Sequence, residues 1–158
     1  DISQILPDKE KERVLDKYYF PYRNSVEQTI QTAVEAGKQV LHIAVHSFTP
    51  VLKGEVRKAD IGLLYDPKRE GEQLFCQSWK AALKKEAPQL VVRSNYPYLG
   101  TADGFPTYLR KKYKASEYLG IELEVNQKYP EGEQAKWTAV KAWIYTSLAE
   151  TLQTWRAG

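Results

Sequence analysis

The chain has 158 residues, of which 42% are hydrophobic and 27% are charged. That is enough to bury one core but too few for two ordinary domains, so we expect a single domain over residues 1–158. A formal charge of +3, with acidic and basic residues interspersed, lacks the clustered basic stripe that binding to a phosphate backbone requires. We therefore expect no nucleic-acid partner.

The sequence also argues against membrane insertion and secretion. No apolar run approaches the roughly 18 residues of a membrane span, and no signal segment opens the chain. Cys76 is the only cysteine, which excludes an internal disulfide and favours a reducing, cytoplasmic compartment. There is no methionine, so residue 1 is not a retained initiator, and we expect a fragment or part of a longer protein. The oligomeric state is not predicted.

The first predicted elements are helical. Residues 8–19 are charged and indicate a helix, which we expect Pro21 to interrupt. Asn24, followed three residues later by Glu27, resembles a capping box that opens a second helix, and this helix should end near Gly37. Residues 40–45 are short, apolar and β-branched, and they predict a buried strand.

Strands and helices then alternate. Residues 60–65 predict a second strand, after which Asp66 and Pro67 should cap and open a helix that Pro88 ends. The remaining predicted elements are a strand at 90–93, a loop over 95–104, a short helix near 107–113, a strand over 119–125 and a long final helix. This order predicts a three-layer αβα fold with a mostly parallel sheet, whose ligand site lies at the carboxyl ends of the strands.

Both histidines of the chain lie in one apolar stretch, residues 41–48. Side chains alternate along a strand, so His42, Ala44 and His46 should share one face. We expect His46 where the strand gives way to a loop, with Ser47 next, and a neutral imidazole there suits a zinc ligand or a general base. A hydrogen-bonded structural histidine is the alternative for His46 and the preferred interpretation of His42.

The strand predicted over residues 119–125 carries Glu122 and Glu124 on one face of an otherwise apolar sequence. Burying a carboxylate costs free energy unless it is paired, hydrogen-bonded or bound to metal. Such surroundings also raise the pKa of a carboxylate toward neutrality and make it a competent general base. The alternative is an edge strand with one face in water.

A polar loop follows the strand at 90–93 directly, from Arg93 to residue 104. It combines a planar cation with the amide of Asn95, phenols and flexible backbone, and this set would bind the carboxylate of an anionic substrate. Loops of this composition are also common without any ligand. Arg23, just ahead of the predicted capping box, is a second candidate for holding a carboxylate, although most such arginines lie on a helix surface.

Four blocks, in order, resemble the signature blocks of the N-formylglutamate amidohydrolase family. They are HIAVHSFTP at residues 42–50, ADIGLLYDP at 59–67, the loop at 93–104, and GIELEVNQ at 120–127. The resemblance covers roughly residues 18–150. It implies a phosphorylase/hydrolase-like fold of the zinc exopeptidase type and a small acidic substrate, N-formyl-L-glutamate, hydrolysed to L-glutamate and formate.

The resemblance, with a more distant likeness to zinc carboxypeptidases, also implies roles for individual residues. His46, at the end of an apolar strand that closes His-Ser, would be a Zn²⁺ ligand. Glu122, in an apolar Glu-Leu strand, would be the general base, with Glu124 as a hydrogen-bonding or structural neighbour. Arg93, Asn95 and Arg23 would bind the substrate's carboxylates. Further supporting candidates are His42, Ser47 and Asp103.

One departure from the family pattern limits this assignment. Relatives carry an earlier strand and loop with a Glu-His block that supplies further metal ligands, and nothing in this sequence corresponds to it. A catalytic zinc usually takes three protein ligands plus water, so we expect the chain to lack the family's N-terminal strands and to present part of the site. Two rival interpretations are a non-catalytic relative that binds small carboxylates, and a metallopeptidase of different specificity.

Overall fold

The computed structural model describes residues 7–157 and divides into two compact units, residues 1–40 and residues 41–158. The strand that begins at Val40 belongs almost entirely to the second unit. The expectation of a single domain over residues 1–158 stays a prediction.

The first unit is helical. Its elements α1 (Asp8–Val14), the π-helical turn η2 (Leu15–Tyr19) and α2 (Phe20–Glu35) follow one another without a gap. The predicted interruption at Pro21 is wrong: Pro21 lies in the first turn of α2, directly after the π-helical turn η2, and the helical run continues through it. The predicted capping box is also wrong, since Asn24 and Glu27 lie inside α2.

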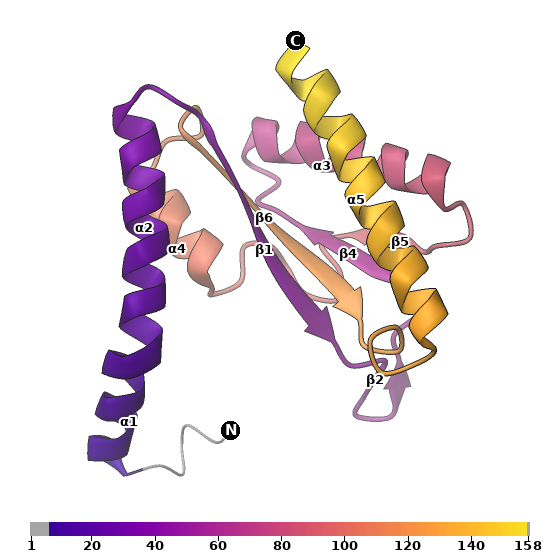
Figure 1. The fold of residues 1–158 in the computed structure, drawn as a ribbon, viewed down its shortest axis with the longest axis horizontal. Coiled ribbons are helices and arrows are strands. Elements are labelled where there is room, and N and C mark those ends of the chain that lie inside the picture. Colours follow the sequence, from indigo (N-terminus) through magenta and orange to yellow (C-terminus); the bar gives the residue numbers. More distant parts are fainter. Residues whose placement is uncertain (1–6, 158) are drawn as a thin grey trace. The chain divides into compact units, whose positions relative to one another are not determined.

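Four strands form the main sheet of the second unit in the spatial order β1-β6-β4-β5. They are β1 (Val40–Phe48), β4 (Ile61–Leu64), β5 (Val92–Ser94) and β6 (Tyr118–Asn126). β4 and β5 are parallel, and the arrows of β1 and β6 point the same way in Figure 1. β4 and β6 are antiparallel. The sheet is therefore mostly parallel, as predicted, with one antiparallel pairing at its centre.

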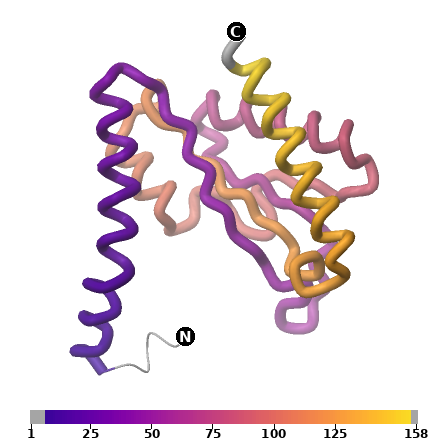
Figure 2. Tube along the Cα trace, viewed as in Figure 1, coloured from indigo at the N-terminus to yellow at the C-terminus, as the bar shows by residue number. Residues whose placement is uncertain are grey.

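Two helices, α3 (Glu70–Glu86) and α5 (Gln134–Ala157), cover one face of this sheet (Figures 1 and 2). Alternate side chains of β4 and β6 point toward them because the side-chain period of a strand is two. Trp79 of α3 is fully buried there and its indole N–H donates to Ser147 of α5 over 3.1 Å. The buried apolar residues of this layer include Ile61, Leu63, Phe75, Leu83, Ile121, Leu123 and Val140.

The opposite face of the sheet meets α4 (Phe105–Lys112) near the start of β6. A Cβ added to Gly120 would lie 3.1 Å from Cβ of Pro106, so the absence of a side chain at Gly120 allows this close packing. Helices therefore flank both faces of the sheet, which confirms the predicted α/β class. Glu122, the predicted general base, and its neighbour Glu124 lie on the α4 side.

Several element boundaries differ from the prediction. β1 continues to Phe48, so His46 lies inside the strand and not at its end. α3 begins at Glu70, so Asp66 and Pro67 do not cap and open it as predicted. The Asp66 Oδ1 accepts a hydrogen bond from the Lys68 N–H over 2.9 Å, in a turn ahead of the helix. α3 ends ahead of Pro88, as predicted.

A small hairpin between β1 and β4 was not predicted. β2 (Val51–Leu52) pairs antiparallel with β3 (Glu55–Val56). Lys53 and Gly54 connect them with φ angles of 50° and 84°, the left-handed pair that a two-residue type I′ turn requires. This hairpin forms one wall of a cleft described below.

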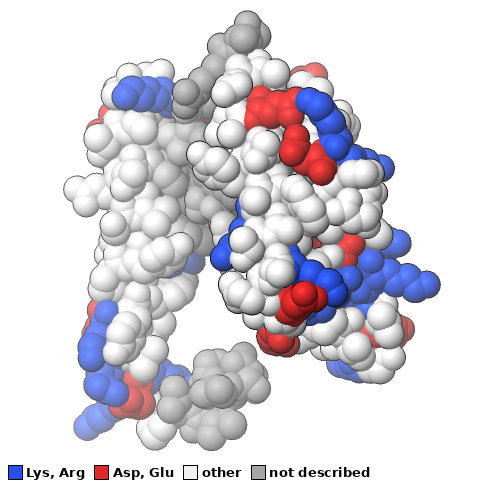
Figure 3. All heavy atoms as spheres, turned by 45° about the vertical axis from the view of Figure 1, so that its right-hand side comes forward, with Lys and Arg blue, Asp and Glu red and all other residues white. Residues whose placement is uncertain are grey.

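The described residues contain no helix suited to cross a membrane and, on the face shown in Figure 3, no patch of a single charge sign. None of their helices combines the length and the apolar character that a membrane crossing needs. Acidic and basic side chains are interspersed on the face shown in Figure 3.

Candidate functional site

Glu122 and Glu124 lie on a central strand of the sheet, since β6 has β1 on one side and β4 on the other. The alternative of an edge strand with a wet face is therefore wrong. In the antiparallel pairing, Leu64 is opposite Glu122 and Gly62 is opposite Glu124. The two carboxylates share the face that α4 and the loop after β5 approach, as the alternation along β6 predicted.

The pairing of β1 with β6 places His46 next to one of these acids. The Gln127 N–H donates to the Phe48 carbonyl over 2.9 Å where the two strands end. Followed back along two parallel strands, this bond aligns His46 with Glu124 and Ala44 with Glu122. The imidazole and the two acids therefore share one face, and Glu124 is the direct lateral neighbour of His46.

Glu124 is the more deeply buried acid of the pair. It is 5% exposed, and its Oε2 is the buried side-chain oxygen or nitrogen atom without a hydrogen-bond partner among the described residues. Glu122 is half-buried. A buried carboxylate oxygen without a donor is costly, so it indicates a group that meets a water, a cation or a substrate.

Burial raises the pKa of both carboxyl groups above their ordinary range. For Glu124, desolvation is the largest cause, and the charges of His46 and Arg57 oppose it. For Glu122, desolvation again dominates, and His46 opposes it. The same histidine thus acts on both acids, and a raised pKa makes either acid a stronger proton acceptor than an ordinary glutamate.

His42 has a structural role. Its Nδ1 lies 2.8 Å from the hydroxyl oxygen of Tyr118, and its ring packs edge-on against Phe105 of α4. Desolvation lowers the pKa of His42, so the imidazole is held neutral. This agrees with the interpretation of His42 as a hydrogen-bonded structural histidine. By contrast, among residues 7–157 the half of β1 that carries His46 makes one side-chain hydrogen bond, and Ser47 makes it.

Asn95 organises the loop that follows β5. Its Oδ1 accepts hydrogen bonds from the N–H groups of Tyr65 and Gly100, each over 3.0 Å. Its own N–H donates to the Leu63 carbonyl over 2.9 Å, and its φ of 49° is a left-handed value that Asn tolerates. The amide oxygen is thus committed to shaping the loop, and a substrate could use the amide nitrogen.

Arg93 is exposed on β5, in register with Gly62, and its guanidinium carbon lies 5.0 Å from the centre of the Tyr96 ring. This places it beside the loop, on the face that carries the acids. Its substrate-binding role stays a prediction.

The other predicted site residues are more dispersed. Arg23 belongs to the helical unit, where it donates to the Tyr19 hydroxyl over 2.7 Å. Ser47 accepts a hydrogen bond from the Gln127 side chain over 3.2 Å and, by alternation, lies on the face opposite His46. Asp103 is exposed in the loop after β5.

Arg57 was missed by the sequence analysis. It follows β3 directly, and its guanidinium carbon lies 5.1 Å from the Tyr98 ring centre and 5.8 Å from that of Phe48. Its positive charge lowers the pKa of Glu124, against the effect of burial. No periodic pattern marked this arginine, because it lies between a two-residue strand and a loop.

A buried ion pair fixes the segments around the acids. Arg110 of α4 and Glu72 of α3 are 5% and 1% exposed at their side chains, with Nε and Oε1 3.0 Å apart. Glu72 also accepts from the Gly120 N–H over 2.9 Å, and Arg110 donates to the carbonyls of Gly100 and Gly120 over 2.6 Å each. The start of β6 and the loop after β5 are therefore tied to the same pair.

The fit of this site to a metal ion is incomplete. Residues 7–157 bring together no group of three His, Cys, Asp or Glu side chains that could hold one. The bare oxygen of Glu124 and the neighbouring imidazole of His46 are suitable donors by their chemistry. They are fewer than the three protein ligands that a catalytic zinc usually takes, so no chemical step is derived through a metal.

Comparison with known proteins gives a family and a fold. The sequence model of the family described as N-formylglutamate amidohydrolase matches residues 2–129. No curated protein matches the sequence.

Two solved structures are similar in fold. A gene product from Agrobacterium tumefaciens is 24% identical with a TM-score of 0.73, over 96% of this chain and 57% of that one. An N-formylglutamate amidohydrolase from Ralstonia eutropha is 15% identical with a TM-score of 0.62, over 95% of this chain and 56% of that one. The chain thus spans a little over half the length of each structure.

Proposed function

Because the chain belongs to the N-formylglutamate amidohydrolase family, we propose that it hydrolyses the amide bond of an N-acylated acidic amino acid. N-formyl-L-glutamate is the first substrate to test, since the Ralstonia eutropha structure carries that enzyme's name. The single observation that carries the proposal is the buried, unpartnered Oε2 of Glu124 beside His46.

One of the two carboxylates on β6 would act as general base. The family resemblance implied Glu122, whereas the alignment with His46 and the bare oxygen support Glu124 better. The carboxylate would take a proton from a water molecule as the water oxygen bonds to the acyl carbon. It would return that proton to the amide nitrogen as the C–N bond breaks, giving formate and glutamate. The raised pKa of the acid suits both proton transfers.

Substrate orientation would come from cationic and polar side chains. Arg93 and Asn95 are the candidates on β5 and its loop, and Arg23 is a candidate from the helical unit. Bidentate bonds from a guanidinium would orient an acidic substrate and select for it. Zn²⁺ remains part of the proposal, with His46 as one of the ligands that it would need.

A second candidate is a carboxylate-binding protein without catalysis. The observation that favours it is the lack of a three-ligand metal group among residues 7–157. Adding Zn²⁺ separates the two candidates. Hydrolysis of N-formyl-L-glutamate that depends on zinc supports the amidohydrolase, whereas substrate binding without turnover at any zinc concentration supports the binding protein.

Two matched substitutions test the general base. Glu124→Gln and Glu122→Gln each replace a carboxylate by an amide of nearly the same size. We expect the first to lower kcat by about 10²- to 10⁴-fold, the usual contribution of a general base, and the second to lower it less. Unchanged turnover in both variants would reject a carboxylate of β6 as the base.

A further inference from the structure

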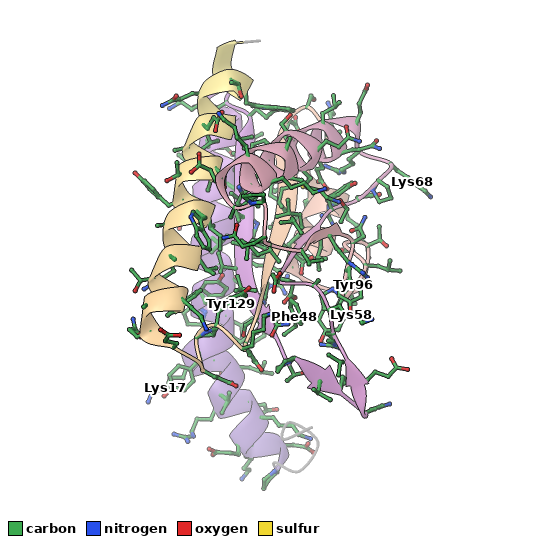
Figure 4. The ribbon with its side chains drawn as sticks, turned by 90° about the vertical axis from the view of Figure 1, so that its right-hand side faces the viewer. Lys17, Phe48, Lys58, Lys68, Tyr96 and Tyr129 are labelled. Atoms are coloured by element: carbon green, nitrogen blue, oxygen red, sulfur yellow. The ribbon has the colours of Figure 1, made fainter. Side chains whose placement is uncertain are left out.

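A cleft of about 350 Å³ opens between the β2–β3 hairpin and the loop after β5. Arg57 and Tyr96 line it from opposite sides, and Figure 4 shows Tyr96 and Phe48 at this end of the sheet, near the hairpin. The other lining residues are Leu52, Lys53, Glu55, Val56 and Pro97. Tyr96 and Pro97 belong to the loop at 93–104, whereas the hairpin side of the cleft contains none of the individual site residues that the family resemblance implied.

Arg57 is held in a defined orientation at this cleft. Its Nη1 donates to the Tyr98 hydroxyl over 3.1 Å, and its guanidinium lies over the rings of Tyr98 and Phe48. Its backbone N–H donates to the Pro50 carbonyl over 2.8 Å, and its carbonyl accepts from the Asn126 side chain over 3.4 Å. Bonds at both ends of the residue order it before any ligand arrives, which reduces the entropy lost on binding.

The cleft lies next to the proposed reaction centre. A Cβ placed on Gly62 would collide with the Tyr96 carbonyl oxygen and would lie 3.3 Å from Cβ of Glu124. The backbone of Tyr96 therefore rests on the sheet directly beside Glu124. A molecule that extends from Glu124 along Tyr96 enters the cleft that Arg57 lines.

The charge and the donors of the cleft suit an anion. Lys53 and Arg57 contribute two positive charges to its lining against one negative charge from Glu55. A guanidinium carries five N–H donors in a planar fork, and the hydrogen bond to Tyr98 uses one of them. The remaining edge matches the two oxygens of a carboxylate.

We propose that this cleft binds a carboxylate of the substrate and that Arg57 is the residue that recognises it. This inference rests on the proposed function, because it assumes an acidic substrate whose amide bond lies at Glu124. It assigns recognition of a substrate carboxylate to Arg57, which follows β3, in addition to Arg93 and Arg23.

The test compares Arg57→Gln with the wild-type chain on three substrates. These are N-formyl-L-glutamate, N-formyl-L-glutamine, which lacks the side-chain carboxylate, and N-formyl-4-aminobutyrate, which lacks the α-carboxylate. We expect Arg57→Gln to raise KM for N-formyl-L-glutamate by about 10- to 100-fold with a smaller effect on kcat. The increase should disappear for the one analogue that lacks the carboxylate bound by Arg57.

Two further variants control for folding and for charge. Arg57→Lys keeps the charge but loses the planar fork, so its KM for N-formyl-L-glutamate should lie between those of the wild-type chain and of Arg57→Gln. Lys85→Gln removes one positive charge from an exposed pair with Glu150 on α5 and should leave all three KM values unchanged. If Arg57→Gln does not fold, the Arg57→Lys series carries the same comparison.

Binding of the product separates failure of this inference from failure of the proposed function. If the wild-type chain binds L-glutamate by calorimetry and Arg57→Gln weakens that binding, the inference holds even where no substrate is hydrolysed. If hydrolysis occurs and Arg57→Gln changes no KM, or raises KM equally for all three substrates, the inference is overturned. If the chain neither hydrolyses N-formyl-L-glutamate nor binds L-glutamate, both are overturned.

Discussion

Gly62 of β4 lies opposite Glu124 of β6, and the absence of a side chain at Gly62 lets the backbone of Tyr96 rest on the sheet at that point. Gly62 is fully buried and has an ordinary strand conformation, so the glycine is required by space and not by its φ angle. The contact joins two parts of the proposed site: the acid on the central strand and the loop that lines the Arg57 cleft.

Gly62→Ala should displace the Tyr96 loop. The added methyl group would collide with the Tyr96 carbonyl oxygen, which is backbone and cannot swing aside as a side chain could. We expect a loss of about 1–3 kcal/mol in the free energy of unfolding and a higher KM for N-formyl-L-glutamate, measured by urea denaturation and initial rates. Gly71→Ala is the control, because its added Cβ would lie 3.5 Å from Leu119, an ordinary contact, within α3. Equal stability of the two variants would contradict the close packing at Gly62.

Glu124→Gln should stabilise the chain near pH 8. The folded-state pKa of Glu124 is raised above its unfolded value by desolvation, so the cost to stability grows as the pH rises from the unfolded value to the folded pKa and is complete above it. As the pH falls toward about 4.3, the unfolded value, Glu124 is protonated in the folded chain and the cost disappears. We expect a gain of about 1 kcal/mol at pH 8 that shrinks on acidification. Exposed Glu131→Gln should show no such dependence, and a gain that grows as the pH falls would contradict the prediction.

Hydrolytic activity should fall on acidification, at a pH above the ordinary pKa of a glutamate side chain. A general base must be ionised, and desolvation raises the pKa values of Glu124 and Glu122. The acidic limb of kcat/KM should therefore lie above pH of about 4.3. Initial rates between pH 4 and 9, with stability checked at each pH, would measure it. A limb at or below the ordinary value would show that neither buried carboxylate is the base.

Arg110→Met should destabilise the chain severely. It would leave Glu72 as a buried anion without its cation and remove the donors of two buried carbonyl groups. Breaking such a pair from one side costs about 3–5 kcal/mol, measurable by urea denaturation. The matched control is Lys85→Met, whose exposed partner Glu150 lies 2.7 Å away and whose loss should cost less than about 1 kcal/mol. Similar effects of the two substitutions would show that the buried pair does not hold β6 and the loop together.

Much of the fold followed from local patterns. The alternation in β6 and the helical period of α5 depend on neighbouring residues, so the sequence predicted both elements and the shared face of Glu122 and Glu124. The continuous helix through Pro21 was not predicted, because a proline in a first turn and one in a helix interior look alike in sequence.

The arrangement of the site depended on contacts between distant segments. Which acid is aligned with His46 is decided by the pairing of β1 with β6, about 80 residues apart, and no local pattern sets that register. Arg57 was missed for the same reason: its ring contacts with Phe48 and Tyr98 exist only after the loop after β5 folds onto the sheet.

The β2–β3 hairpin closes on itself through the two-residue turn at Lys53 and Gly54, while Glu124 sits on the central strand. With the proposed roles of Glu124 and Arg57, chemistry and substrate recognition would lie in separable stretches of the chain. Replacing Lys53 at the tip of the hairpin would change the charge of the cleft and leave the strand that carries Glu124 undisturbed.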